Sequence, residues 1–158
     1  MINKYENIFK LDTKDTSYII RISNFNHILH DYYGAKITDT LDFEFSKEKY
    51  ASMAGTAVNY SEEDPSYVLD LLSQEITSVG KGDYKEASIL IDNGNDYILD
   101  LVYQDYKIND EVKPLDTLPS PHNASKELVL YLKDKYLYTY GSTSNTQQKS
   151  FEYARYLL

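Results

Sequence analysis

The sequence contains no cysteine, so it offers neither disulfides nor thiolate ligands for a metal. It has no apolar run that approaches the roughly 20 residues of a membrane-spanning helix, and its first residues lack the apolar core of a signal peptide. Positive charge is also scarce, because 16 Lys and Arg stand against 25 Asp and Glu, which leaves a net charge of -9. Such a chain repels phosphate backbones and anionic lipid heads. We therefore expect a cytoplasmic protein that binds neither nucleic acid nor membranes.

Motifs for nucleotide binding and for covalent catalysis are absent as well. The segment Gly80-Lys81-Gly82 lies between two apolar runs, but the residues after it are typical of a strand and not of the helix that a phosphate loop requires. We interpret it as a tight turn. The sequence has no G-x-S-x-G elbow, and 25 acidic residues make any chosen acid/base pair arbitrary. It therefore predicts no catalytic residue and no bound cofactor.

The three histidines are poor candidates for metal ligands. His27 and His30 have the spacing of two ligands on a helix, but their segment is typical of a strand, in which residues three apart point to opposite faces. His122 lies in a proline-rich loop and has no evident partner in the sequence. We predict no metal site. Asn59-Tyr60-Ser61 and Asn123-Ala124-Ser125 match the glycosylation pattern, which carries no weight without a secretion signal.

Tyrosine is the residue that the sequence has in excess, with 17 copies and no tryptophan. Aromatic rings stack on sugars, which would allow a carbohydrate-binding face. Tyrosine is also a favoured strand residue with an apolar body and a polar tip. The second interpretation is favoured, because the tyrosines are spread along the chain. The candidates for sugar stacking are Tyr32, Tyr33 and Tyr103.

Short segments of strand type, separated by turn residues, predict one all-β domain. The segments are 8–13 and 17–23 as a hairpin, then 27–34, 86–92, 97–108 and 126–134. A bulge or bend is expected near Leu99-Asp100, and Asn93-Gly94 is a strong hairpin signal. Residues 147–158 fit either a helix or a final strand. This spacing is typical of an antiparallel β-sandwich.

Residues 43–65 differ from the rest of the chain. They have weak periodicity, small residues in their middle and acidic residues at their end. We interpret them as a long excursion from the sheet. Loops of this length are uncommon unless they have a function. This is therefore the segment of greatest functional interest.

Four stretches, in order over residues 8–134, resemble the amino-terminal domain of family 36 glycoside hydrolases, the bacterial α-galactosidases or melibiases. They are "IFKLDTKDTSYIIRIS", "ILHDYYGAKI", "YVLDLLSQEITSVGKGDYKEASILI" and "LDTLPSPHNASKELVLYLKD". The most specific part is Leu69-Asp70, then Gln74-Glu75, then Gly82-Asp83 with an aromatic residue after it. The resemblance implies a β-supersandwich in which residues 69–91 form a strand, a turn and a strand. It also implies that Gln74 and Glu75 satisfy backbone groups and are not catalytic.

The resemblance also indicates what this chain does not contain. Enzymes of the family are several times longer, and both of their catalytic Asp residues lie on a (β/α)8 barrel after this domain, so no catalytic residue is carried over. In tetrameric members, a loop of this domain supplies an acidic residue and an Arg to a neighbour's active site. The matching residues 53–65 contain no Arg, and no acidic residue where the first should fall. Residues 135–158 depart from the family pattern, so we treat them as an extension of the sandwich in residues 1–134.

The sequence therefore predicts the non-catalytic amino-terminal β-sandwich of an α-galactosidase-like protein. Its expected roles are assembly with a catalytic barrel and shaping of a pocket for an α-galactoside. The alternative is a free-standing carbohydrate-binding module. A sandwich that stops at Leu158 is expected to have an unpaired edge at residues 127–132, through which two copies could pair into a homodimer or a larger assembly.

Overall fold

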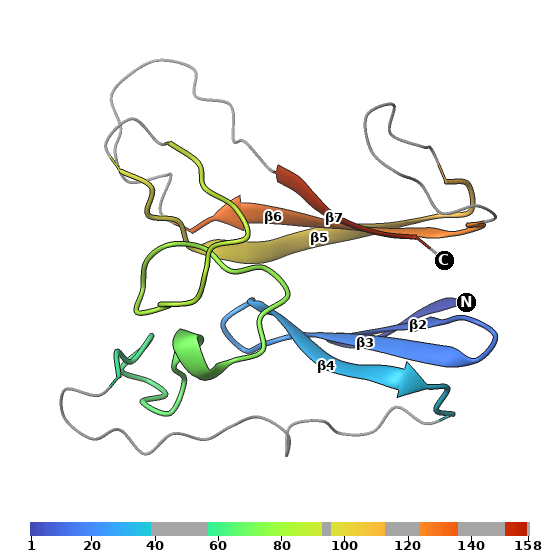
Figure 1. The fold of residues 1–158 in the computed structure, drawn as a ribbon, viewed down its shortest axis with the longest axis horizontal. Helices are drawn as coiled ribbons and strands as arrows, with labels where there is room; N and C mark the ends of the chain where they lie inside the picture. The colour runs from blue at the N-terminus through green and yellow to red at the C-terminus, as the bar shows by residue number, and fades with distance from the viewer. Residues whose placement is uncertain (39–56, 93–95, 113–123, 136–150, 158) are drawn as a thin grey trace.

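A computed structural model describes residues 1–38, 57–92, 96–112, 124–135 and 151–157 (Figure 1). Two antiparallel sheets face each other, one with the strand order β1-β2-β3-β4 and the other with the order β5-β6-β7. The strands are β1 (Ile2–Tyr5), β2 (Ile8–Asp12), β3 (Thr16–Ile22), β4 (Ile28–Ala35), β5 (Leu101–Asn109), β6 (Glu127–Asp134) and β7 (Phe151–Leu157). The predicted all-β antiparallel sandwich is confirmed.

The first sheet forms from neighbouring strands joined by short turns. The expected hairpin of 8–13 and 17–23 is confirmed as β2 and β3, and Thr13 Oγ1 closes its turn by accepting the N–H groups of Asp15 and Thr16, at 3.3 and 3.0 Å. The expected segment 27–34 is confirmed as β4. Strand β1 was not expected, because Ile2 is its only buried residue and the rest of its sequence is polar or exposed.

A β-bulge interrupts the pairing of β3 with β4. Ile19 pairs with Tyr32 and Ile20 pairs with His30, so Asp31 is the extra residue of β4. The bulge reverses the usual alternation. His30 and Tyr33 are three residues apart and yet share one face of the sheet.

The second sheet has β6 at its centre. Leu128, Leu130 and Leu132 all point into the core, as their alternation predicts. The prediction of an unpaired edge at residues 127–132 is wrong, because β7 pairs with Glu127–Leu132 on the side opposite β5. The final-strand interpretation of 147–158 is confirmed by β7, and a homodimer through the edge of β6 is excluded. The position expected for a bulge, near Leu99-Asp100, is wrong, because β5 begins at Leu101 and its register shifts between Tyr103 and Asp105.

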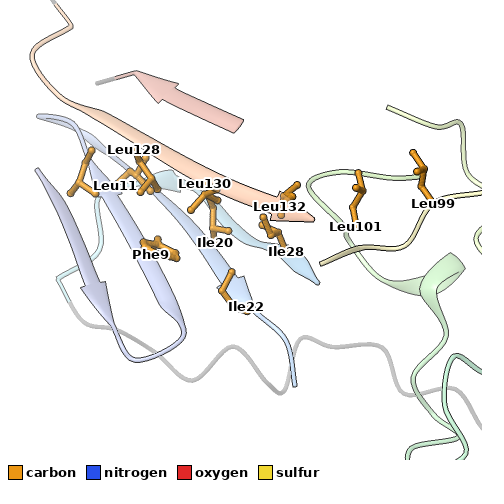
Figure 2. Packing of buried hydrophobic residues seen from close by; sticks show 11 residues of the cluster. Phe9, Leu11, Ile20, Ile22, Ile28, Leu99, Leu101, Leu128, Leu130 and Leu132 are labelled. Atoms are coloured by element: carbon orange, nitrogen blue, oxygen red, sulfur yellow. The ribbon is translucent and has the colours of Figure 1, made fainter. Parts of the chain in front are cut away.

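The main core lies between the two sheets (Figure 2). Phe9, Leu11, Ile20, Ile22 and Ile28 come from the first sheet, and Leu101, Leu128, Leu130 and Leu132 come from the second. The ring of Phe9 packs edge-on against Tyr106, with centroids 5.1 Å apart, and lies 6.3 Å from Tyr103. Tyr103 packs against this core, and burial raises its pKa to about 12. Its interpretation as an exposed stacking residue is wrong.

The expected strand, turn and strand over residues 69–91 is only partly right. The turn is confirmed, because Gly80 and Gly82 have positive φ and the N–H of Asp83 donates to the carbonyl of Gly80 at 3.0 Å. The two strands are wrong. The 3-10 helix η2 (Leu69–Leu71) takes the place of the first, and residues 86–92 pack Ile89 and Ile91 on the core without a strand partner.

Gly82 is the position in this turn where a side chain is least tolerable. Its φ of +77° is left-handed, and an added Cβ would overlap Val58. Gly82→Ala should lower the free energy of unfolding by about 1–3 kcal/mol, measured by urea denaturation. Gly34→Ala is the control, because φ is not positive there and the new Cβ meets only the flexible end of Tyr32, 2.6 Å from its hydroxyl. Equal losses in the two variants would contradict the prediction.

Several sequence predictions concern residues outside the described segments. They include His122, the Asn93-Gly94 signal, the acceptor Asn123 and most of the excursion 43–65. The described part of 135–158 adds β7 to the second sheet. Within the described residues, no helix is long and apolar enough to cross a membrane.

Candidate functional site

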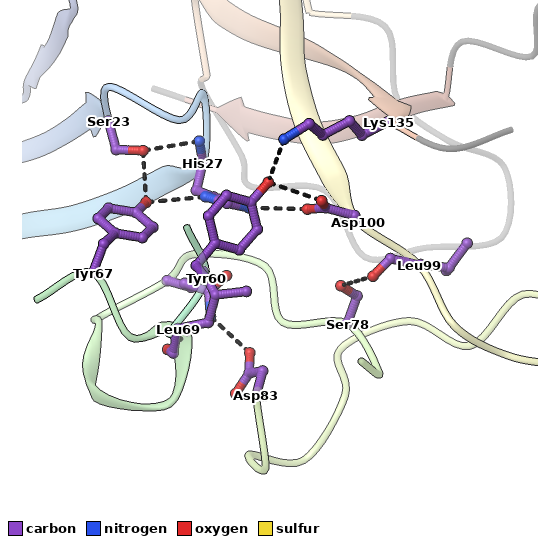
Figure 3. Close-up of polar contacts among 11 residues, drawn as sticks. Ser23, His27, Tyr60, Tyr67, Leu69, Ser78, Asp83, Leu99, Asp100 and Lys135 are labelled. Atoms are coloured by element: carbon purple, nitrogen blue, oxygen red, sulfur yellow. Dashed lines mark hydrogen bonds and ion pairs between the residues drawn. The ribbon is translucent and has the colours of Figure 1, made fainter. Parts of the chain in front are cut away.

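A group of polar side chains, buried except for Tyr60 and Lys135, joins one end of the two sheets to the segment that follows residue 57 (Figure 3). We call it the polar cluster, and it consists of Ser23, His27, Tyr60, Tyr67, Asp100 and Lys135. Ser23 follows β3, His27 precedes β4, Asp100 precedes β5 and Lys135 follows β6. The cluster therefore lies where four strand ends meet.

His27 is held through both of its ring nitrogens. Nδ1 lies 3.0 Å from the Tyr67 hydroxyl, and Nε2 lies 3.1 Å from Asp100 Oδ1. The Ser23 hydroxyl lies 2.7 Å from the Tyr67 oxygen and accepts the main-chain N–H of His27. Burial raises the pKa of Tyr67 well above its usual value, so its hydroxyl remains a donor. These contacts fit one order of donation, from Ser23 to Tyr67 to Nδ1, with the ring proton on Nε2 directed at Asp100.

Asp100 is 2% exposed and uses both carboxylate oxygens. Oδ1 binds His27, and Oδ2 accepts the Tyr60 hydroxyl at 2.8 Å. Lys135 Nζ donates to the Tyr60 oxygen at 3.0 Å, and the main-chain N–H of Lys135 donates to the Asp100 carbonyl at 2.9 Å. A buried carboxylate is tolerated when its oxygens are hydrogen-bonded, and His27 and Tyr60 satisfy one oxygen each.

Aromatic rings enclose the polar cluster on the side of residues 57–72. Tyr60 lies edge-on to Phe25 at 5.2 Å and to His27 at 4.8 Å, and Tyr67 lies 4.6 Å from Phe25. Tyr67 also belongs to a second apolar cluster with Leu29, Leu69 and Leu72. Tyr60 and Tyr67 are therefore anchored by their rings as well as by their hydroxyls.

The polar cluster is suited to holding the chain in place and not to acid/base chemistry. A catalytic histidine needs one ring nitrogen that can exchange a proton with a substrate. Both nitrogens of His27 have protein partners, and His27 and Asp100 are buried. The cluster therefore fastens residues 57–72 across the ends of both sheets.

Gln74, one of the residues singled out in the sequence, acts on the backbone as expected. Its Nε2 donates to the Leu69 carbonyl at 3.1 Å and to Asp83 Oδ2 at 2.7 Å. Asp83 is buried, and its other oxygen lies 2.8 Å from Lys85 Nζ. The Gln-Glu and Gly-Asp elements of the sequence pattern thus meet in space, where they fix the Gly80–Gly82 turn against η2.

Glu75 uses its main chain and its side chain differently. Its main-chain N–H donates to the Ile28 carbonyl at 3.0 Å. Its carboxylate oxygen Oε1 accepts the hydroxyl of Tyr18 and lies 2.9 Å from His30 Nδ1. His27 and His30 therefore have separate partners. Within the described residues, no group of three His, Asp or Glu side chains is arranged to hold a metal ion.

Of the three tyrosines singled out for sugar stacking, Tyr103 packs on the core, and the other two differ in exposure. Tyr33 is 66% exposed, whereas Tyr32 is half-buried and its hydroxyl donates to the Ala35 carbonyl at 2.8 Å. Only Tyr33 therefore presents a largely open ring.

Sequence reasoning missed the polar cluster, although one signal was available. Asp100 lies in the apolar run "YILDLVY" at 97–103, and a charged residue in such a run indicates a buried and partnered carboxylate. Its partners could not be identified, because His27 lies 73 residues away in the sequence.

Comparison with known proteins places this fold in a family. Residues 26–144 match the model described as the glycosyl hydrolase family 36 N-terminal domain. The chain is 32% identical over 127 residues to the bifunctional alpha-galactosidase/sucrose kinase AgaSK of Mediterraneibacter gnavus, covering 79% of this chain and 13% of that protein. It is 26% identical over 137 residues to alpha-galactosidase 2 of Pediococcus pentosaceus, covering 80% of this chain and 18% of that protein.

Solved structures give the same result. The galactosidase domain of AgaSK superposes with a TM-score of 0.73 at 27% identity, covering 85% of this chain and 19% of that chain. The alpha-galactosidase of Lactobacillus brevis superposes with a TM-score of 0.70 at 25% identity, covering 81% of this chain and 18% of that chain. The chain thus spans less than a fifth of the length of these relatives. It belongs to the family of glycosyl hydrolase family 36 N-terminal domains.

Proposed function

We propose that this chain is the non-catalytic amino-terminal β-sandwich of an α-galactosidase-like glycoside hydrolase. In this proposal it assembles with a catalytic domain and helps to shape the pocket for an α-galactoside. The observation that carries the proposal is the family match over residues 26–144, combined with the small share of each relative that the chain spans. The named relatives are α-galactosidases.

The position of the polar cluster supports a role in pocket shaping. Residues 53–65 match the loop that, by resemblance, reaches a neighbour's active site, and Tyr60 lies within this stretch. Tyr60 is fixed by its hydroxyl on Asp100 and by its N–H, which donates to the Tyr67 carbonyl at 3.0 Å. The polar cluster would therefore fix residues 57–60, the described part of this stretch up to Tyr60, against the sandwich.

An exposed apolar surface supports assembly with another domain. Val58, Val79 and Ile98 are exposed around the Gly80–Gly82 turn, where Val58 and Ile98 lie close to the two glycines. Apolar side chains grouped in this way are typical of a surface that another domain or subunit covers. We infer that the catalytic domain packs here. A homo-oligomer and a cytoplasmic location stay predictions.

Activity measurement tests the proposal. The purified chain should give no hydrolysis of an aryl α-galactoside above the buffer blank, because the catalytic barrel is not part of it. The intact Pediococcus relative, assayed in parallel, is the positive control. Turnover that stays with the chain through a second, different purification would overturn the proposal. A (β/α)8 barrel encoded in frame after Leu158 would support it.

A further inference from the structure

Tyr33 is the exposed tyrosine with the most elaborate surroundings. Its ring centroid lies 5.8 Å from that of Tyr18, and Tyr18 in turn lies 5.0 Å from the His30 ring. Glu75 binds both Tyr18 and His30. We call these four side chains the Tyr33 platform. Among the described residues, the other exposed tyrosines, Tyr5, Tyr84 and Tyr97, have no ring packed beside them.

The platform depends on the bulge at Asp31. Tyr18 pairs with Tyr33 and Ile20 pairs with His30, so the extra residue places His30 and Tyr33 on the same face. Asp31 is held by a two-pronged contact with Arg21, whose Nε and Nη2 donate at 2.7 and 3.0 Å. Both side chains are almost fully buried. Bulges are enriched beside functional sites, where they re-aim a side chain, and this one is fixed in place.

Glu75 holds two members of the platform, Tyr18 and His30, in place. Its side chain is 11% exposed, and Oε1 holds the Tyr18 hydroxyl and His30 Nδ1 at once. Burial, and next the hydrogen bond to Glu75, raise the pKa of Tyr18 well above its usual value, so Tyr18 remains a donor. Because Nδ1 is engaged, Nε2 of His30 is left to face a ligand. The His30 side chain is 35% exposed, and Nε2 has no partner among the described residues.

We propose that the Tyr33 platform binds a neutral pyranose. The C–H face of the sugar ring would lie on the open ring of Tyr33, and a sugar hydroxyl would bond to His30 Nε2. The net charge of -9 and the carboxylate of Glu75 disfavour an acidic sugar or a phosphate. A purely structural role accounts for Tyr18, His30 and Glu75, but it does not require a ring that is 66% exposed at Tyr33. This activity goes beyond assembly with a catalytic domain and does not depend on it.

NMR titration of the purified chain with galactose, melibiose and raffinose tests the proposal. We expect saturable shifts centred on the amides of His30, Tyr33 and Gly34, with dissociation constants in the millimolar range that suits a small ligand on one exposed ring. Tyr33→Ala should weaken binding about tenfold, whereas Tyr33→Trp should retain it. Galacturonate should bind more weakly than galactose, because its carboxylate meets negative charge.

Tyr97→Ala is the matched control, because Tyr97 is 52% exposed and lies outside the platform. It should leave all three titrations unchanged. Saturation absent at any attainable sugar concentration would overturn the proposal. Equal weakening by Tyr97→Ala and Tyr33→Ala, or shifts centred away from residues 30–34, would overturn it too. Both tyrosines are exposed, so both variants should fold, and an unchanged thermal midpoint verifies this.

Discussion

Replacing Asp100 with alanine should lower the free energy of unfolding by about 3–5 kcal/mol. The substitution leaves the Nε2 proton of His27 and the hydroxyl of Tyr60 without their acceptor in a buried site. For a chain of this size the thermal midpoint should fall by about 10 °C. Urea denaturation gives the free energy, and calorimetry gives the midpoint.

Two variants make this measurement decisive. Tyr60→Phe removes one donor and keeps the ring, so it should cost only about 1 kcal/mol. Asp105→Ala removes an exposed carboxylate from β5, the strand that follows Asp100, and should change stability by less than about 0.5 kcal/mol. If Asp100→Ala were no more destabilising than Asp105→Ala, the polar cluster would not hold residues 57–72. If a protease cuts the Asp100→Ala variant within residues 57–72 faster than it cuts the unsubstituted chain, that result would support this role directly.

Arg21→Met is the second substitution with a large expected effect, again about 3–5 kcal/mol. It removes the cation that binds both oxygens of Asp31 and leaves that carboxylate buried beside an apolar side chain. Removing one partner of a buried ion pair lowers the free energy of unfolding more than replacing both partners with apolar residues does. The double variant Arg21→Met with Asp31→Leu should therefore recover much of the loss. Urea denaturation of both variants measures the difference.

The ion pair of Lys126 with Asp110 provides the contrast. It is solvent-exposed, with side-chain exposures of 41% and 84%, so Lys126→Met should cost less than about 1 kcal/mol. A similar small cost for Arg21→Met would mean that solvent still reaches Asp31. A double variant less stable than Arg21→Met alone would show that leucine does not fit at the bulge.

Strand-favouring residues between turn residues were enough to predict most of the two sheets. They identify β2, β3, β4 and β6, although clean alternation is confined to Leu128, Leu130 and Leu132 of β6. The charged residues inside apolar runs, Arg21 and Asp100, are buried and paired. Their partners come from other segments, so a local pattern cannot identify them. The Asp31 bulge was also missed, because nothing in "ILHDYYGA" marks the extra residue.

Residues 86–92 show the limit of the alternation rule. Ala87, Ile89 and Ile91 are partly buried, and Ser88 and Leu90 are exposed, which is the period-2 pattern of a strand. The segment nevertheless forms no ladder. It is held at Thr77, whose carbonyl accepts the N–H of Ser88 at 3.0 Å and whose hydroxyl donates to the Glu86 carbonyl at 2.6 Å. Alternation indicates extended backbone over a core, and it does not guarantee a neighbouring strand. Strand β1 is the opposite case, because its hydrogen bonds to β2 form with little apolar content.

The strand order has a consequence for the way in which this chain folds. Each described strand pairs with its neighbour in the sequence, so both sheets can grow strand by strand. The first sheet closes only short turns at small entropic cost, whereas the second must close the longer connections 110–126 and 135–150. Contacts such as Phe9 with Tyr106 join distant parts of the chain and form only when the two sheets dock. Folding should therefore be limited by this docking. The polar cluster bonds groups from both sheets, so it forms in the same late step.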